Sequence, residues 1–586
     1  MLNNIRSYFY KFKRFQSPLE KYVFPIILLL FPLAGVNAGL DITDVTYNMA
    51  NFRFMELIDP MWILSTYVGN SLGYLIMKLP GAGSLLGFGI YCSFLFGAVM
   101  LVVYYVLQKF MPGWMIFLGL LMAEGLSWCP RVIMYNYCTY YLMTFGALFL
   151  LAGIFAMERQ NLYLFLAGVC LGMNVMVRFP NVTQSMLILV LWFYGAVAKE
   201  KFREIVKETL VCIGGYATGF AIPLVFISIT YGPTAYFDMI GNLFGMTKGA
   251  SDYTAGVMVA SIMEAYLTTG RHMLIMIPCI MAGIIMFLFA KGKYVPVKKI
   301  LYILGLLILV RYYFASGVFT RNYYYYDSIF QAAMMFVIIT LVISIIASFG
   351  ILNGSKQEQT LGFLLVMIIL ITPLGSNNYT FPIINNLYLV APIGLWLLRR
   401  LMQRLGEGDH NFPWQAMVTT VIIVCLIQGA LFRFNFSFVD GADGTKRDTK
   451  VTFMEKGNGL VTTKSNADSL NELSSFLRDN GLYGEPAIFF GSVPGLSYFF
   501  DMEPSIDTVW PDLDSYTTEH FDAEMSRLSG SDDPEPTVIV GFDSTGSSSY
   551  NYKYDILLDY IANHDYNKVF ESDRFTVYCG GIESEE

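Results

Sequence analysis

Long apolar segments determine most of what this chain can fold into. About thirteen stretches have the length of roughly 20 mostly apolar residues that a helix needs to cross a bilayer. They lie at 22–38, 84–107, 113–129, 138–157, 162–178, 182–198, 209–230, 272–290, 300–318, 328–349, 360–374, 382–398 and 415–432. Hydrophobic residues make up 55% of the chain and charged residues only 14%, which excludes an ordinary soluble protein. The sequence therefore predicts a polytopic α-helical membrane protein.

Basic residues give this topology its orientation, because Lys and Arg collect in cytoplasmic loops. With about thirteen spans, the basic clusters around Lys13, Lys201, Lys298 and Arg400 all fall on one side, which we predict to be cytoplasmic. The N-terminus is then inside, in an expected plasma-membrane location. The loops 40–83 and 231–271 and everything after residue 432 lie outside. The net charge of −7 gives no basic face for nucleic acid.

The first apolar segment has two interpretations. A basic start, the apolar run from Phe24 to Leu33 and the small residues around Ala38 resemble a cleavable signal peptide. The segment, with prolines at positions 25 and 32, is also long enough to remain as a kinked membrane helix. Cleavage would leave the predicted topology downstream unchanged.

The outer loops and the C-terminal region have structure of their own in this prediction. Aromatic, aliphatic and polar residues mix in the 40–83 and 231–271 loops, as in helices that lie in the membrane interface, and Gly69, Gly73 and later glycines are expected to break regular structure. After Phe432 the composition becomes polar. Helices at 466–480, 517–528 and 552–563 and strands at 487–490, 537–540 and 575–578 predict an extracytoplasmic α/β domain within 433–586.

Two carboxylates follow the first apolar segment directly, at the outer edge of the membrane. Asp41 and Asp44 are three residues apart, so on a helix they would lie on one face and could share a metal or divide base and orienting roles. Alternatively, Asp41 is a helix N-cap and Asp44 complements the helix dipole. Tyr47 and Asn51 follow the pair and favour the functional interpretation.

A third carboxylate, Glu124, lies near the outer end of the third apolar segment. An ionisable residue within a span is expensive and suggests a functional site, although a position close to the interface would let it stay hydrated. We expect Glu124 to contact the substrate. Asp41, Asp44 and Glu124 could together supply oxygen ligands to Mg²⁺ or Mn²⁺, but the sequence does not require a metal.

Several arginines are expected on the same outer side. Arg131 lies in a loop with Tyr135 and Asn136, which we expect to contact the substrate. Arg178 ends the fifth segment, where it could bind an anion or extend along the helix to water. Arg321 precedes four consecutive tyrosines, which form either an aromatic belt or a wall facing a sugar or lipid. Arg131, Arg178 and Arg321 are the candidates for binding a donor phosphate.

Acids and arginines on one leaflet suit a group transfer. A carboxylate takes the proton of an acceptor hydroxyl while guanidinium groups bind an anionic leaving group. A sugar linked to a polyprenyl phosphate is such a donor, because its phosphate leaves as an anion without a proton. A single base acting opposite the leaving group implies inversion at the sugar carbon.

The layout resembles the GT-C superfamily of membrane glycosyltransferases, which includes protein O-mannosyltransferases and aminoarabinose transferases. The resemblance covers most of the chain: an acidic motif in the first long outer loop, interfacial helices there, many spans and an outer C-terminal domain. The family's acidic pair is usually adjacent and soon followed by Tyr, whereas here Asp41 and Asp44 are separated and Tyr47 follows three residues later. That relation to Tyr47 favours Asp44 as the base, with Asp41 orienting it or binding a metal.

The resemblance implies transfer of a sugar from a polyprenyl-phosphate donor to a hydroxyl on a glycan, lipid or protein, with membrane lipid as a further partner. A transporter or flippase of lipid-linked sugars is the alternative function. Such a protein should show repeated halves and charges near the bilayer midplane, and neither is evident. A scaffold that only presents the C-terminal domain would leave Asp44 without a role.

Overall fold

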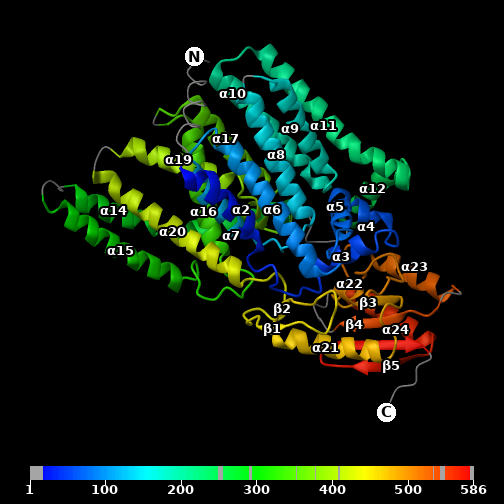
Figure 1. Ribbon diagram of the computed structural model, residues 1–586. Helices are drawn as coiled ribbons and strands as arrows, with labels where there is room; N and C mark the ends of the chain where they lie inside the picture. The colour runs from blue at the N-terminus through cyan, green and yellow to red at the C-terminus, as the bar shows by residue number, and fades with distance from the viewer. Residues whose placement is uncertain are drawn as a thin grey trace.

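The computed structural model describes residues 17–156, 158–247, 255–288, 293–351, 353–376, 378–406, 409–531, 534–541 and 548–580. These residues form a bundle of helices with a small α/β domain, hereafter the tail domain, at one end (Figure 1). The turn between α10 (Leu189–Ala198) and α11 (Phe202–Tyr231) lies at the opposite end of the bundle.

The helical part contains short and long elements in chain order. They are η1 (Leu19–Val23), α2 (Phe24–Leu30), η2 (Phe31–Leu33), α3 (Asp44–Arg53), α4 (Pro60–Leu64), α5 (Tyr67–Met77), α6 (Leu85–Leu107), α7 (Gly113–Gly125), α8 (Tyr135–Phe155), α9 (Gln160–Val175), η3 (Phe179–Ile188), α10, α11, α12 (Ala235–Thr247), α13 (Ala255–Met273), α14 (Met276–Phe287), α15 (Val295–Ala315), α16 (Phe330–Ser348), α17 (Lys356–Ile371), α18 (Phe381–Asn385), α19 (Val390–Leu405), η5 (Asp409–Asn411) and α20 (Phe412–Asn435).

Seven helices in the described part of the chain are long and apolar enough to cross a membrane. They are Leu85–Leu107, Tyr135–Phe155, Phe179–Ala198, Phe202–Tyr231, Gly256–Phe287, Phe330–Ser348 and Asp409–Asn435. The protein is thus a mostly helical, polytopic membrane protein, and the larger count of spans stays a prediction. The segments expected at 113–129 and 162–178 form the shorter apolar helices α7 and α9, and the one expected at 382–398 is divided between α18 and α19.

The first predicted span, 22–38, ends earlier than expected. Helical structure continues through η1, α2 and η2 and stops at Leu33. The chain then extends, and Ala38 forms a parallel bridge with Val461, where β2 of the tail domain begins. The residues just before Asp41 are therefore already part of the contact between the bundle and the tail domain.

The 40–83 loop forms three short helices, α3, α4 and α5, beside the tail domain (Figure 1). The expectation that Gly69 and Gly73 break regular structure is wrong, because both lie inside α5. A Cβ atom at Gly73 would lie 2.4 Å from the Phe52 ring of α3, and one at Gly69 would lie 3.2 Å from the Tyr135 backbone. These glycines therefore let α5 pack closely on α3 and on the start of α8. In the 231–271 loop the structure has α12 and most of α13.

Small residues also set the close packing of α9 against α11. Gly168 and Gly172 on α9 face Gly215 and Gly219 on α11, where added Cβ atoms would lie 1.9–2.1 Å from backbone oxygens of the other helix. Two small residues spaced four apart are a common way for membrane helices to bring their backbones together.

The tail domain contains β1 (Thr449–Lys450), β2 (Val461–Thr462), α21 (Lys464–Asp479), β3 (Ala487–Phe490), α22 (Gly495–Phe500), α23 (Thr518–Ser529), β4 (Thr537–Gly541), α24 (Ser548–Asn563), β5 (Tyr566–Glu571) and β6 (Phe575–Gly580). β1 and β2 are antiparallel. The other strands form one sheet in the order β3-β4-β6-β5, in which only β3 and β4 pair in parallel. All residues of β3 and β4 are buried, as their apolar sequences predict.

The tail domain packs directly on α3, the helix that follows Asp41. The N–H of Gly495 in α22 donates to the Ile42 carbonyl at 2.8 Å, and Gly495 lies so close to Thr46 that a Cβ atom there would clash. At the other end of α3, Arg53 forms an ion pair with Asp501 at 3.0 Å. Both ends of α3 are therefore fixed by the tail domain.

Candidate active site

One face of α3 is polar although the helix lies inside the molecule. Asp44 is three residues before Tyr47 and four before Asn48, and Asn51 follows these two by four and three residues, which places all four on the same face. Asn48 and Asn51 are buried, while Asp44 and Tyr47 are partly exposed. The side-chain oxygen of Asn51 has no hydrogen-bond partner among the described residues. A polar helix face with an unpartnered buried oxygen is typical of a binding site.

Asp41 lies before α3, so the expectation that both carboxylates share one helix face is wrong for this residue. Its carboxylate accepts hydrogen bonds from the backbone N–H groups of Thr43 at 2.7 Å and Val45 at 2.8 Å, and from the Thr43 hydroxyl at 2.5 Å. Asp41 therefore satisfies N–H groups at the start of α3, although it lies two residues before the N-cap position, Thr43, and is not the N-cap itself.

Asp44 is the first residue of α3, and its carboxylate accepts no hydrogen bond from any residue that the structure describes. Burial raises the pKa of Asp44. Burial, and then the charge of Asp44, also raise the pKa of Asp41, against the effect of its hydrogen bonds from Thr43 and Val45. The two carboxylates thus lie close together. Asp41 accepts hydrogen bonds from the backbone, whereas Asp44 accepts none from the described residues.

Two tyrosines lie near Asp44, and a third lies near those two. Burial raises the pKa of Tyr47 and Tyr326, and the negative charge of Asp44 raises both further, so both rings lie near this carboxylate. The same electrostatic effects place Tyr135, at the start of α8, near Tyr47 and Tyr326. The Trp128 indole N–H donates to the Tyr326 carbonyl, which fixes the loop that carries this tyrosine.

Arg178 lies on the other side of Tyr135. Its guanidinium is 5.9 Å from the centre of the Tyr135 ring and donates to the Gly375 carbonyl. Within the described ranges no carboxylate lies within ion-pair distance of Arg178, and the residue is partly exposed. Tyr135 therefore has the Arg178 guanidinium beside it and Tyr47 of the polar α3 face nearby.

Buried amides fix the turn that carries Arg178. The Asn181 N–H donates to the Arg178 carbonyl at 3.0 Å, and the Asn181 side chain donates to the Thr139 hydroxyl at 2.9 Å. Asn174 donates to the Thr139 carbonyl at 2.9 Å and to the Gln184 side chain at 2.6 Å. These bonds tie Arg178 to α8, the helix that begins at Tyr135.

The other predicted phosphate-binding residues have different surroundings. The Arg131 guanidinium donates to the Phe436 carbonyl at 3.1 Å and to the Arg433 carbonyl at 2.5 Å, at the C-terminal end of α20. Together with Asp41 and Arg433 it lines a cavity of about 50 Å³, which has room for only a few water molecules. Arg321 is exposed and lies over the Phe314 ring at 5.5 Å. Asn136 is partly exposed beside Tyr135.

Glu124 lies in an interior ion pair. Its carboxylate is 2.8 Å from the Arg433 guanidinium and accepts a hydrogen bond from the Tyr388 hydroxyl at 3.1 Å. Sequence reasoning missed Arg433, although an arginine directly after the last apolar segment was a signal for it. The structure thus brings Asp44, Tyr47 and Tyr135 together and holds Glu124 with Arg433.

The donor set for a divalent cation is limited. No group of three or more His, Cys, Asp and Glu side chains that could hold a metal ion occurs in the described parts of the chain. The oxygens of Asp41 accept three hydrogen bonds, and Glu124 faces Arg433. Asp44 is thus the only one of the three expected ligands without a protein partner among the described residues, and this set does not fit a cation held by all three.

The tail domain contributes one aromatic residue to this region. The Trp510 ring packs edge-on against Tyr47, with the ring centres 5.4 Å apart. The chain directly after Trp510 is fixed, because the buried Lys553 ammonium donates to the carbonyls of Pro511 at 2.9 Å and Leu513 at 2.7 Å. Nothing in the local sequence around Trp510 pointed to this contact.

Comparisons with known proteins gave similar structures only. No protein-family model matches the chain, and no curated protein matches it. The similar solved structures include the archaeal oligosaccharyltransferase AglB from Archaeoglobus fulgidus in complex with an inhibitory peptide and a dolichol-phosphate. It has 11% sequence identity and a TM-score of 0.44, over 96% of this chain and 75% of that chain.

Two further structures are of the Archaeoglobus fulgidus oligosaccharyltransferase. The apo form has a TM-score of 0.44 over 90% of this chain and 70% of that one, and the complex with Zn and sulfate has a TM-score of 0.46 over 89% and 67%. Both are 11% identical to this chain.

Proposed function

We propose that this protein is an inverting glycosyltransferase that moves a sugar from a polyprenyl-phosphate donor to a hydroxyl acceptor on the extracytoplasmic face. The observation that carries the proposal is the Asp44 carboxylate. It lies on the polar face of α3 and accepts no hydrogen bond from the described residues, while the Arg178 guanidinium lies over the ring of Tyr135, a neighbour of Tyr47 on that face.

In the proposed reaction, Asp44 takes the proton of the acceptor hydroxyl. The acceptor oxygen then forms a bond to the anomeric carbon of the donor sugar, and the bond between that carbon and the phosphate oxygen breaks. The polyprenyl phosphate leaves with the bonding electron pair, and the Arg178 guanidinium stabilises its charge. Attack opposite the leaving group inverts the anomeric configuration.

The remaining site residues have supporting roles in this proposal. Asp41 orients Asp44 by fixing the first turn of α3 through its bonds to Thr43 and Val45. Tyr47 and Tyr135 form the wall against which the sugar packs. A base needs a raised pKa to take a proton effectively near neutral pH, and burial provides it for Asp44.

The test uses the purified protein in lipid with a panel of polyprenyl-phosphate sugars, and measures which donor is consumed and whether polyprenyl phosphate is released. Asp44→Asn should reduce turnover by about 10²-fold or more, the scale of a general base. Asp448→Asn is the matched control, because Asp448 is an exposed carboxylate. Normal turnover by Asp44→Asn would remove this residue from the proposed role.

Arg178→Ala should weaken donor binding, and Arg178→Lys should restore part of it, because an ammonium keeps the charge but not the guanidinium geometry. Arg203→Ala, at an exposed position of α11, is the control. Unchanged donor affinity in Arg178→Ala would move the phosphate site to Arg131 or Arg321.

A chelator added to the same assay tests the predicted use of Mg²⁺ or Mn²⁺. Donor that crosses the bilayer unconsumed would instead identify a flippase.

A further inference from the structure

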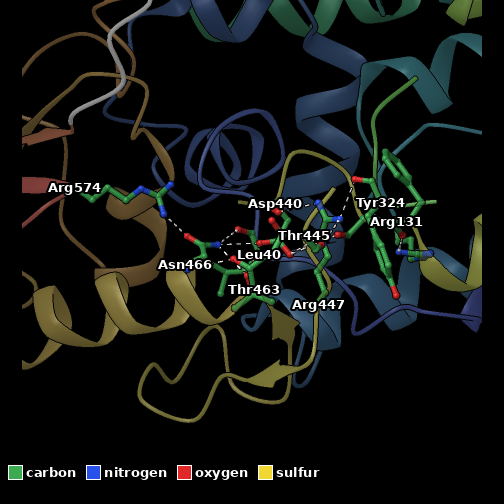
Figure 2. Close-up of polar contacts among 12 residues, drawn as sticks. Leu40, Arg131, Tyr324, Asp440, Thr445, Arg447, Thr463, Asn466 and Arg574 are labelled. Atoms are coloured by element: carbon green, nitrogen blue, oxygen red, sulfur yellow. Dashed lines mark hydrogen bonds and ion pairs between the residues drawn. The ribbon is translucent and has the colours of Figure 1, made fainter. Parts of the chain in front are cut away.

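The residue before Asp41 is held by Asp440, on the polar segment that leads into the tail domain, and by Asn466 of α21. The Leu40 carbonyl accepts a hydrogen bond from the Asn466 side chain at 3.1 Å, and the Leu40 N–H donates to the Asp440 carboxylate. On the N-terminal side, the Gly39 N–H donates to the Val461 carbonyl at 2.8 Å. Figure 2 shows Leu40 between Asp440 and Asn466.

Asp440 and Asn466 are in turn fixed by buried partners. Asp440 is 1% exposed and accepts hydrogen bonds from the Asn466 side chain at 2.9 Å and from the Thr462 hydroxyl. The Asn466 side-chain oxygen accepts a bond from Arg574, the residue before β6 (Figure 2). The position of Leu40 is therefore set through α21 and the tail-domain sheet.

The same cluster reaches the opposite wall of the candidate site. The Arg447 guanidinium lies 3.7 Å from the Asp440 carboxylate and donates to the Asp440 carbonyl at 2.9 Å. It also donates to the Tyr324 carbonyl at 3.1 Å, two residues before Tyr326, as Figure 2 shows. One set of polar contacts thus connects the segment that leads to Asp44 with the loop that carries Tyr326.

We propose that Asp440, Arg447 and Asn466, hereafter the junction cluster, are positioning residues that set the place of Asp44 relative to Tyr326. This inference rests on the proposed function. The cluster contacts no reacting atom. It acts through the Leu40 backbone, which leads to Asp41 and the first turn of α3, and through the Tyr324 backbone.

The proposal assigns a specific task to the tail domain. A domain that only adds stability would need no buried carboxylate and amide aimed at the backbone of one residue. Removing a partner that holds a catalytic segment displaces it, and a displacement of about 1 Å can reduce a rate about 10²-fold. Donor binding should change little, because Arg178 is fixed by a separate set of amides on α8, α9 and η3.

The experiment compares Asp440→Asn and Asn466→Ala with Asp468→Asn in the full-length protein. Asp468 is an exposed carboxylate on the same helix as Asn466 and serves as the matched control. Two quantities are measured: hydrogen exchange of the Leu40 amide with its neighbours, and kcat and KM for the donor over a range of pH. Both test variants should exchange faster at Leu40 and lose about 10- to 100-fold in kcat with an unchanged KM.

The pH profile separates positioning from partial unfolding. If Asp41 moves relative to Asp44, the pH at which kcat falls on the acidic side, the acidic limb of the profile, shifts. A smaller folded fraction instead lowers the maximum kcat and leaves that pH unchanged. Unchanged exchange at Leu40 overturns the proposal, and so does faster exchange with a wild-type kcat or an unmoved limb. If the wild-type protein consumes no donor, the proposed function fails, and the exchange measurement alone still decides whether Asp440 and Asn466 hold this segment.

Discussion

Replacing Glu124 with Gln tests whether this carboxylate serves the substrate or the fold. Glu124 and Arg433 have side chains 0% and 3% exposed and lie 2.8 Å apart. Removing one partner of a buried ion pair leaves the other charge unpaired, which reduces the free energy of unfolding by about 3–5 kcal/mol. Arg433 keeps its hydrogen bond to the Pro32 carbonyl at 2.8 Å, so we expect a loss at the lower end, about 3 kcal/mol.

The double variant Glu124→Gln/Arg433→Met provides the decisive comparison. It removes both charges and leaves mainly the Pro32 carbonyl without its donor, so its loss should be smaller, about 1–2 kcal/mol. Denaturant unfolding in micelles measures all four members of the cycle, and donor affinity is measured in parallel. A double variant less stable than either single variant would refute the ion-pair argument. A tenfold loss of donor affinity in a stable double variant would instead indicate that Glu124 contacts the substrate.

Two further predictions concern the carboxylates at α3. Burial raises the pKa of Asp44, and a base must be ionised to accept a proton. As the pH is lowered, kcat/KM should therefore begin to fall at a pH above the ordinary Asp pKa of about 4. A decrease centred on that ordinary pKa would contradict the burial argument. The pKa of Asp41 is raised in the folded protein, which therefore binds the proton more tightly than the unfolded chain, and stability should fall as the pH rises through the raised pKa. Asp41→Asn should remove this decrease. If the reasoning is wrong, the free energy of unfolding measured from pH 5 to 9 will depend on pH in the variant as it does in the wild-type protein.

The tail domain shows which strands a sequence reveals. The strands β3, β4 and β6 were predicted because each is an apolar run that the sheet buries. β5 was not predicted. It lies at the edge of the sheet, where only Tyr566 of its residues is buried, and the exposed Asn567 and Lys568 interrupt the apolar pattern.

The candidate site was predictable only where helical periodicity applies. The spacing of three residues between Asp44 and Tyr47 places both on one face of α3. The partner of Arg131 could not be predicted in this way. Arginine suggested a phosphate, whereas the structure gives it the backbone carbonyls of Arg433 and Phe436 at the end of α20, where a helix leaves its last carbonyls unpaired. Such a partner has no side-chain signature.

Asp41 and Asp44 show how one short sequence can supply two different acids. Asp41 accepts three hydrogen bonds, and any movement of its carboxylate would release the N–H groups that begin α3. Asp44 follows on the first turn with no such bonds from the described residues, so it can exchange a proton without disturbing the helix. A chemical step at Asp41 would therefore have to break the structure that positions Asp44, whereas a step at Asp44 breaks nothing. On these grounds we propose that the second carboxylate is the base and that the first fixes the helix that presents it.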